Sequence, residues 1–208
     1  MTIAGKLTDK QGEELLKRLD NLPKRKNKSK NKEKTMNNVM IDLETMSTDS
    51  NAAIVSIGAV FFNENEIGKK FYVNVDLGSS VMAGGVTDQD TINWWNKQSE
   101  SVRYALEDMK QPIERALKFF TEFLGDAKNI KIWGNSSAFD NVILANAYKR
   151  LGNDVPWQFW NDRCYRTMKS LFKDVEMKRE GEHHNAEDDA VSQAKHLIEI
   201  VKKHGIKL

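Results

Sequence analysis

Val39-Met40-Ile41-Asp42-Leu43-Glu44 is the stretch of sequence that decides the fold. Its apolar entry and the alternation that follows predict a β-strand, and residues two apart on a strand point to the same face. The side chains of Asp42 and Glu44 therefore converge, and two convergent carboxylates repel each other unless a cation lies between them. Such hard oxygen ligands suit Mg²⁺ or Mn²⁺. The triplet is equally consistent with solvated acids at the end of a strand, because short motifs often match by chance.

The rest of the chain shows strand patterns first and then alternating helix and strand. The further strands are predicted from β-branched, apolar or alternating runs, and the helices from apolar residues at helical spacing. The strands cover residues 53–62, 71–75 and 130–133; the helices begin near residue 87 and cover 112–124, 139–151 and 186–203. We therefore predict a layered α/β domain in which helices flank a mixed central sheet.

Length and composition indicate an ordinary globular protein. A chain of 208 residues fits one domain with some excess. The single cysteine, Cys164, cannot form an internal disulfide, which fits a reducing cytosol. The longest apolar run, 52–62, is shorter than the roughly 20 residues that span a bilayer. Since residues 1–6 also lack the apolar core of a signal peptide, we expect a soluble, cytoplasmic protein with no membrane contact.

The charge is divided between an N-terminal tail and the remaining body. Residues 1–35 hold 11 basic and 5 acidic side chains, whereas the other 173 residues hold 21 and 25. We predict that the tail forms a short helix that ends at Pro23, followed by a basic, disordered linker; the folded domain then covers 36–208. The linker is consistent both with attraction to nucleic acid and with a plain solvated segment. An acidic body can bind a polyanion if cations offset its carboxylates, which is the first indication of metal.

A second polar cluster follows the strand at 130–133. Gly134-Asn135-Ser136-Ser137-Ala138-Phe139-Asp140 places an amide and a carboxylate where a strand gives way to a helix. The same pattern is typical of helix capping by Asn135 or Ser136. Phe139 is more typical of a core residue than of a substrate contact, but we expect its neighbour Asp140 to lie near the strand ends.

A third cluster, His183-His184-Asn185-Ala186-Glu187-Asp188-Asp189, opens the C-terminal helix. A histidine has an ordinary pKa near 6.5, so beside a metal site it can accept the proton of an attacking water. The acids also suit the positive end of a helix dipole, which is a sufficient reason for any one of them. A zinc site is disfavoured, because one cysteine and two adjacent histidines lack the usual ligand spacing.

Taken in order, the three clusters resemble the exonuclease motifs of the DEDDh family, which includes the proofreading subunit of bacterial DNA polymerase III and ribonuclease T. The resemblance covers residues 38 to about 202. The stretches Met40-Ile41-Asp42-Leu43-Glu44-Thr45-Met46, Thr91-Ile92-Asn93-Trp94-Trp95 and Trp157-Gln158-Phe159-Trp160-Asn161-Asp162 look like phage-encoded 3′–5′ exonucleases and exodeoxyribonuclease VIII-like proteins. Mycobacterial-type exoribonucleases are related to this branch.

The resemblance implies an RNase H-like fold in three layers and hydrolysis of single-stranded nucleic acid from its 3′ end to nucleoside 5′-monophosphates. It implies that Asp42, Glu44 and Asp189 bind two divalent cations directly, with Asp42 shared, and that Asp140 acts largely through water. His184 is implied as the general base. His183 and Asp188 have the same spacing as His184 and Asp189; Ala186 stands where the family commonly has alanine, so we choose His184 and Asp189.

Substrate contacts are predicted more loosely. Thr45, Met46, Asn135 and Phe139 are expected to contact the terminal nucleotide, because they lie beside the metal ligands in sequence. Other candidates for base stacking or phosphate contact, each also consistent with core packing or a surface ion pair, are Trp94, Trp95, Trp133, Trp160, Arg163 and Arg166. DNA is the favoured substrate. RNA is the alternative, because no residue decides whether a 2′-hydroxyl is contacted. A third hypothesis is a nucleic-acid-binding module without catalytic activity.

Overall fold

The computed structural model describes residues 36–181 and 184–208. The predicted N-terminal helix, the basic linker and His183 lie outside these residues. In the described part, one mixed sheet has the strand order β3-β2-β1-β4-β5. Its strands are β1 (Asn38–Thr45), β2 (Ile54–Phe62), β3 (Ile67–Asn74), β4 (Lys131–Gly134) and β5 (Asp162–Cys164).

The strand that carries Asp42 and Glu44 lies at the centre of the sheet. β1 pairs antiparallel with β2, with Asp42 opposite Gly58, and parallel with β4, with Ile41 opposite Gly134. β2 and β3 form a second antiparallel pair, and β4 and β5 a second parallel pair. The mixed sheet predicted from the sequence is therefore confirmed, and its central strand ends at the predicted acids.

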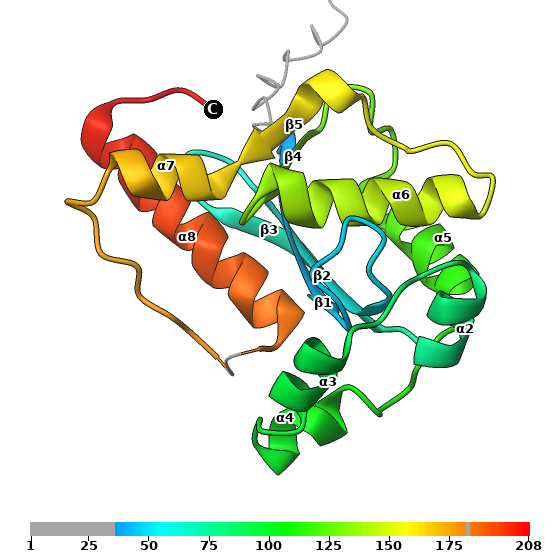
Figure 1. Ribbon diagram of the computed structural model, residues 1–208. Helices are drawn as coiled ribbons and strands as arrows, with labels where there is room; N and C mark the ends of the chain where they lie inside the picture. Colours follow the sequence, from blue (N-terminus) through cyan, green and yellow to red (C-terminus); the bar gives the residue numbers. More distant parts are fainter. Residues whose placement is uncertain (1–35, 182–183) are drawn as a thin grey trace, which may run out of the picture. The chain divides into compact units, whose positions relative to one another are not determined.

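Helices cover both faces of this sheet, which gives three layers (Figure 1). α5 and α6 pack on one face, and α7 and α8 on the other. Their bounds, with those of the shorter helices, are α2 (Leu77–Met82), α3 (Gln89–Trp95), α4 (Glu100–Ala105), α5 (Ile113–Leu124), η1 (Ser137–Asn141), α6 (Val142–Arg150), η2 (Phe159–Asn161), α7 (Tyr165–Leu171) and α8 (Ala186–His204).

Alternation along β1 divides the core into two parts. Val39, Ile41 and Leu43 are buried on the side of α5 and α6, within the larger apolar cluster. Met40 is buried on the opposite side, against α8. β2 is buried along its whole length, as its apolar sequence predicts for a central strand.

The predicted helices are confirmed with small shifts at their ends. Pro112 is the N-cap of α5, since proline lacks the N–H that a first turn leaves unpaired. The helix predicted over 139–151 is divided into a π-helical turn, η1, and the regular helix α6. Ser136 is the N-cap of η1, one of the two positions that the capping interpretation named, but its side chain makes no capping hydrogen bond.

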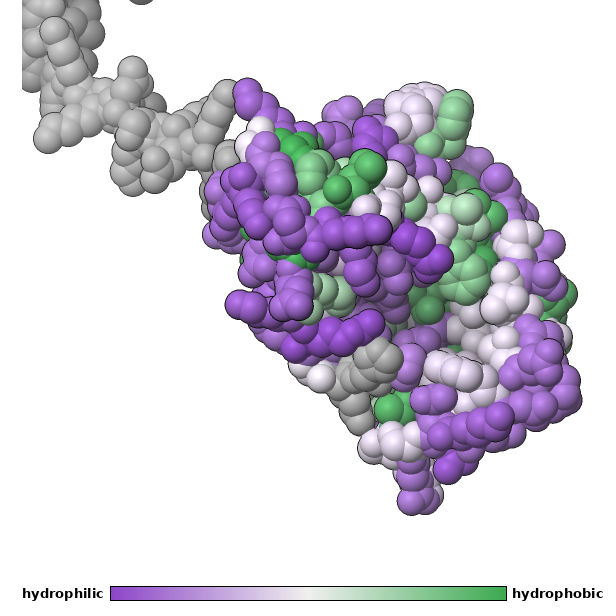
Figure 2. Space-filling view, turned by 60° about the vertical axis from the view of Figure 1, so that its left-hand side comes forward, coloured by the Kyte–Doolittle hydropathy of each residue, from purple (hydrophilic) through white to green (hydrophobic). Residues whose placement is uncertain are grey.

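The surface is mostly hydrophilic on the face shown in Figure 2, with hydrophobic residues in separate patches. Among the described residues, no helix combines the length and apolar character needed to cross a membrane. Cys164 is a free, half-buried thiol. The large apolar side chains that remain exposed are Val81, Met82, Val86, Trp94, Tyr104, Met109, Phe159, Trp160 and Leu171.

Candidate active site

The first two acids continue the α8-facing side of β1. Because side chains alternate, the face that buries Met40 against α8 next carries Asp42 and then Glu44. Asp42 is half-buried, and only 8% of Glu44 is exposed. The strand therefore places two carboxylates between the sheet and the N-terminal end of α8.

The third acid, Asp140, is fixed by the turn that precedes α6. The amide of Asn141 donates to the carbonyl of Ile132 (3.0 Å) and to the carboxylate of Asp162 (2.8 Å), which ties η1 to β4 and β5. A Cβ at Gly134 would lie 2.4 Å from Oδ1 of Asn141 and 2.9 Å from Cβ of Asp140. A glycine at the end of β4 is therefore what allows the turn to bring Asp140 close to the sheet.

The fourth acid comes from the first turn of α8. The helix starts after Asn185, whose side chain accepts hydrogen bonds from the N–H groups of Glu187 and Asp188. A Cβ at Gly58 would lie 2.0 Å from the carbonyl carbon of Ala186, so only glycine lets α8 begin this close to β2. Asp189 is thereby held over β1.

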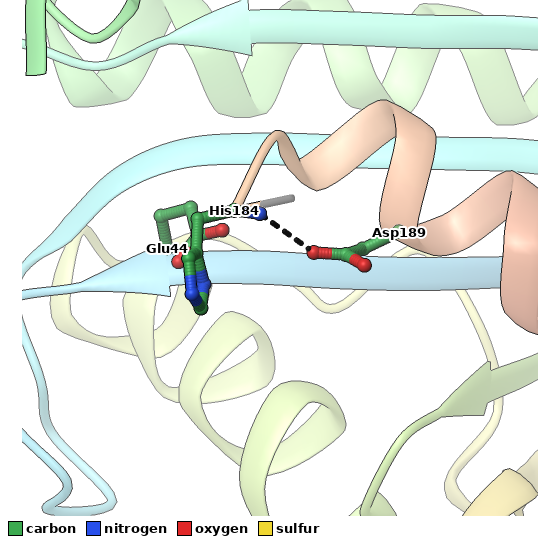
Figure 3. A group of neighbouring side chains, drawn as sticks. All are labelled: Glu44, His184 and Asp189. Atoms are coloured by element: carbon green, nitrogen blue, oxygen red, sulfur yellow. Dashed lines mark hydrogen bonds between the residues drawn. The ribbon is translucent and has the colours of Figure 1, made fainter. Parts of the chain in front are cut away.

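Glu44, His184 and Asp189 meet at this point (Figure 3). Their potential ligand atoms all lie within 4.8 Å of one another. The backbone N–H of His184 donates to Oδ2 of Asp189 (3.1 Å), and His184 has a left-handed backbone with φ of 66°. This conformation is uncommon for a residue with a side chain and is found often at functional sites.

The four acids also interact electrostatically. Burial, followed by the charges of Asp140, Glu44 and Asp189, raises the pKa of Asp42 well above its usual range. Burial and the charges of Asp189 and Asp140 raise the pKa of Glu44 to about 8. Burial raises the pKa of Asp140 to about 6, although backbone N–H groups such as that of Ser136 oppose the shift. We call Asp42, Glu44, Asp140 and Asp189 the acid cluster.

The geometry bears on the choice between the two His–Asp pairs. Asp188 does not join the group formed by Glu44, His184 and Asp189. A Cβ at Gly181 would lie 2.2 Å from the carboxylate of Asp188, so that acid faces the segment before the helix. The structure therefore brings His184 and Asp189 to the site, whereas His183 lies outside the described residues, so the choice between the two pairs stays a prediction.

A cleft of about 620 Å³ opens beside Glu44. Of the predicted substrate contacts, Thr45 and Phe139 line it, although the Thr45 hydroxyl already donates to the carbonyl of Ser47. Met46 lines a separate cavity of about 400 Å³, and the carbonyl of Asn135 accepts a hydrogen bond from Arg166. The cleft lining is completed by Leu43, Glu44, Ser47, Thr48, Asp49, Asp88, Asp90, Thr91, Trp94 and Trp95.

The four candidate tryptophans separate into two pairs. Trp133 and Trp95 are buried, and their indole N–H groups donate to Asn38 and to the carbonyl of Thr45. Trp94 and Trp160 are exposed. Trp94 lies on the cleft, and its ring meets that of His184 edge-on at 4.8 Å. Trp94 is therefore the tryptophan best placed to contact a nucleotide.

Two residues of the site were not found from the sequence. Nε2 of Gln193 donates to Oδ1 of Asp42 (2.7 Å), and Nη1 of Arg179 lies 2.5 Å from Oδ1 of Asp189. Helical spacing could have identified Gln193, which follows Asp189 by four residues on the same face of α8. Arg179 lies on an irregular segment, where no periodic pattern indicates its direction.

Comparison with known proteins agrees with this arrangement. Residues 37–201 match the model of a protein family described as the 3′-5′ exoribonuclease Rv2179c-like domain. No sequence among the curated proteins matches the chain.

Solved structures share the fold at low sequence identity. The nuclease domain of 3′hExo, a DEDDh family member bound to rAMP, has a TM-score of 0.55 at 13% identity, over 80% of this chain and 92% of that one. Pop2p of S. pombe in its Mg²⁺- and Mn²⁺-bound form has a TM-score of 0.54 at 15% identity, over 82% of this chain and 84% of that one. Exonuclease X in complex with 5′ overhanging duplex DNA has a TM-score of 0.52 at 17% identity, over 82% of this chain and 94% of that one.

These likenesses confirm the three-layer RNase H-like fold. The family match covers nearly the whole described domain and includes all four acids and His184. The chain therefore belongs to the Rv2179c-like 3′–5′ exoribonuclease domain family and is a 3′–5′ exonuclease.

Proposed function

We propose that the chain hydrolyses single-stranded nucleic acid from the 3′ end to nucleoside 5′-monophosphates, using two divalent cations and His184 as the general base. The observation that supports this proposal is the acid cluster itself. Burial raises the pKa values of three of its carboxyl groups, and neighbouring carboxylate charges raise those of Asp42 and Glu44 further. Such a cluster is costly to fold unless cations offset its charge.

The residues fit hard divalent cations. The ligand atoms of Glu44, His184 and Asp189 lie within 4.8 Å of one another. Opposite ligands of Mg²⁺ are about 4.2 Å apart, so small side-chain rotations would bring these atoms around one ion. Among the described residues, Oε1 of Gln193 has no hydrogen-bond partner although it is buried beside Asp42. An unpaired buried carbonyl oxygen next to a carboxylate suits a site that also holds cations and their water.

In this proposal Asp42, Glu44 and Asp189 bind the cations directly, and Asp140 acts more indirectly. Gln193 holds one oxygen of Asp42 and so fixes the direction of that carboxylate. When bound, two divalent cations stabilise the charge on the attacking and leaving oxygens of the phosphodiester. The number of cations, and the choice of Mg²⁺ or Mn²⁺, belong to the proposal.

The His184 ring could act as a ligand or as a base. We assign it the role of the base because Mg²⁺ prefers oxygen donors, which the acid cluster supplies. The ring of Trp94 meets the ring of His184 edge-on and contributes to its position. From there His184 accepts the proton of the attacking water.

The cleft beside Glu44 suits the last nucleoside of a strand. Apolar and aromatic side chains, among them Phe139 and Trp94, supply surfaces for a base, and Ser47, Thr48 and Thr91 supply hydroxyl groups. Thr45 contributes part of the cleft wall, because its hydroxyl and its carbonyl both form internal hydrogen bonds. We propose Met46 and Asn135 as contacts further from the cation site.

Both sugars remain in the proposal. Residues 40–46, 91–95 and 157–162 resemble phage-encoded exonucleases and exodeoxyribonuclease VIII-like proteins, and we propose that the chain is related to them. This relationship favours DNA as the substrate. The description of the matching family names RNA. A contact to a 2′-hydroxyl distinguishes the two, and the cleft hydroxyls are compatible with either.

Digestion of end-labelled oligonucleotides tests the proposal. Single-stranded DNA and RNA of one sequence, labelled at the 5′ or the 3′ end, are incubated with Mg²⁺, with Mn²⁺ or with EDTA. We expect a ladder shortening from the 3′ end, nucleoside 5′-monophosphates as products and no cleavage in EDTA. Cleavage that persists in EDTA, or internal cuts as the first products, would contradict it.

A further inference from the structure

A guanidinium group lies directly against the acid cluster. Nη1 of Arg179 is 2.5 Å from Oδ1 of Asp189, while the other oxygen of that carboxylate accepts from the backbone of His184. The Arg179 side chain is 52% exposed and that of Asp189 is 13% exposed. Arg179 thus reaches from the surface into the site.

The segment that carries Arg179 is attached to α8. The N–H of Glu180 donates to Oγ of the buried Ser192 (3.0 Å), and the Ser192 hydroxyl is 3.3 Å from the Glu180 carbonyl. Lys195 also forms an ion pair with Glu180. Because Ser192 lies on the helix that bears Asp189, the backbone next to Arg179 is held beside the acid cluster. The Lys195–Glu180 pair joins two exposed side chains and adds little to this attachment.

The net charge of the site with substrate bound leaves room for one more positively charged group. Two divalent cations would balance the four carboxylates of the acid cluster, but a phosphodiester brings another negative charge. The cleft beside Glu44 offers no compensation, because among the described residues that line it there are Asp49, Asp88 and Asp90 but no lysine or arginine. Arg179 enters from the α8 side with a single permanent positive charge.

The chemistry of the side chain fits a phosphate group. A guanidinium carries five N–H donors in a planar fork that matches the oxygens of a phosphate. Of these, Nη1 is directed to Asp189, and about half of the side chain remains open to solvent. The group can therefore bind a phosphate beside Asp189 without losing its place in the fold.

We propose that Arg179 is a phosphate-binding residue of this site, and that in the protein without substrate it competes with the divalent cation for Asp189. The inference rests on the proposed function, because it requires a phosphate beside the acid cluster. It makes two predictions of opposite sign. Loss of the guanidinium strengthens cation binding to the free protein and weakens binding of a nucleotide to the cation-loaded protein.

Calorimetric titration of the full chain measures both effects. Mn²⁺ is titrated into wild type, Arg179→Gln, Arg179→Lys and Lys195→Gln, and AMP is then titrated into each at saturating Mn²⁺. Lys195→Gln is the matched control: it also removes an ion pair of the same segment but leaves the guanidinium in place. Urea unfolding of each variant verifies that the chain is folded.

For Arg179→Gln we expect several-fold tighter Mn²⁺ binding and about tenfold or more weaker AMP binding, with Arg179→Lys between it and wild type. Lys195→Gln should match wild type in both titrations. Unchanged affinities in Arg179→Gln, or equal changes in Arg179→Gln and Lys195→Gln, would overturn the inference. If wild type itself bound neither Mn²⁺ nor AMP, the proposed function would fail instead.

Discussion

The two faces of β1 have different surroundings, although they belong to one strand. On the side of α5 and α6, Val39, Ile41 and Leu43 are all buried in apolar surroundings. On the side of α8, Met40 is buried in the same way, but the next two positions are Asp42 and Glu44. One face is core throughout, whereas the other changes from core to active site within two residues.

The change occurs where α8 begins. Ala190 and Ala194 of α8 are fully buried over Met40, while the first turn of the helix carries Asp189. The close approach at Gly58 brings that turn onto the sheet. Asp42 and Glu44 are therefore partly surrounded by core, which raises their pKa values; under the proposed function, cations would balance this charge.

The largest effect is expected from Asp42→Asn, which keeps the shape of the side chain and removes its charge. Loss of a shared cation ligand should lower kcat/KM by about 1000-fold, because several kcal/mol of stabilisation depend on the bound cations. Steady-state digestion of a labelled oligonucleotide measures it. Asp174→Asn, at an exposed acid paired with Lys203, is the control and should keep full activity. A fully active Asp42→Asn would remove the basis for placing the cations at β1.

A second variant moves the helix rather than the acid. Gly58→Ala puts a methyl group where the backbone of Ala186 now lies, so the start of α8 must shift. We expect a loss of about 100-fold in kcat/KM, the order of effect that a displacement of about 1 Å can have. Gly78→Ala is the matched control, because the nearest atom to its Cβ is a side-chain oxygen at 3.3 Å. Similar activities for the two variants would show that α8 does not need this contact.

The opposite face of β1 should respond in stability and not in catalysis. Ile41→Ala removes a fully buried side chain and should lower the free energy of unfolding by about 2–5 kcal/mol. Its kcat/KM, measured where the variant is folded and cations are saturating, should match wild type. Urea unfolding and digestion of the same preparation test both statements. A large loss of turnover without a loss of stability would mean that the two faces are not independent.

A smaller effect is expected in the pH dependence of stability without cations. The pKa of Glu44 is about 8 in the folded protein against an ordinary 4.5, so between these values the folded chain holds more protons than the unfolded chain. The associated stability is complete below pH 4.5 and is lost as the pH rises to about 8. Asp140, with a pKa of about 6, acts in the same direction.

Urea unfolding in EDTA should therefore show a lower free energy of unfolding at pH 8.5 than at pH 5. Mg²⁺ should reverse the loss, by about 2.7 kcal/mol at one hundred times its Kd. The Glu44→Gln variant serves as the control and should depend less steeply on pH than wild type. A wild-type stability that rises with pH in EDTA would contradict the raised pKa.

Much of the fold could be predicted because its signals are local. Three local patterns each predict their own element: the alternation of β1, the apolar run of β2 and the apolar stripe of α8. The order of the elements along the chain then predicts the layers. The order of Asp42, Glu44, Asp140, His184 and Asp189 was likewise enough to predict a shared site. The structure does bring these residues together, and their roles in catalysis remain predictions.

The rest depends on contacts that the sequence does not express locally. Three-residue β5 exists because Asp162–Cys164 can pair with β4, not because of its own pattern. Met46 follows the predicted metal ligands in sequence, yet its side chain lines a neighbouring cavity. Arg179 meets Asp189 from an irregular segment that a hydrogen bond to Ser192 attaches to α8. Long-range packing decides each of these positions.

The central claim is that the acid cluster holds two divalent cations at the end of β1, and anomalous diffraction from crystals grown in Mn²⁺ tests it most directly. We expect two Mn²⁺ peaks about 3.5–4 Å apart, with an oxygen of Asp42 bound to both. Saturating Mn²⁺ without a peak in contact with Asp42, Glu44 or Asp189 would contradict the claim.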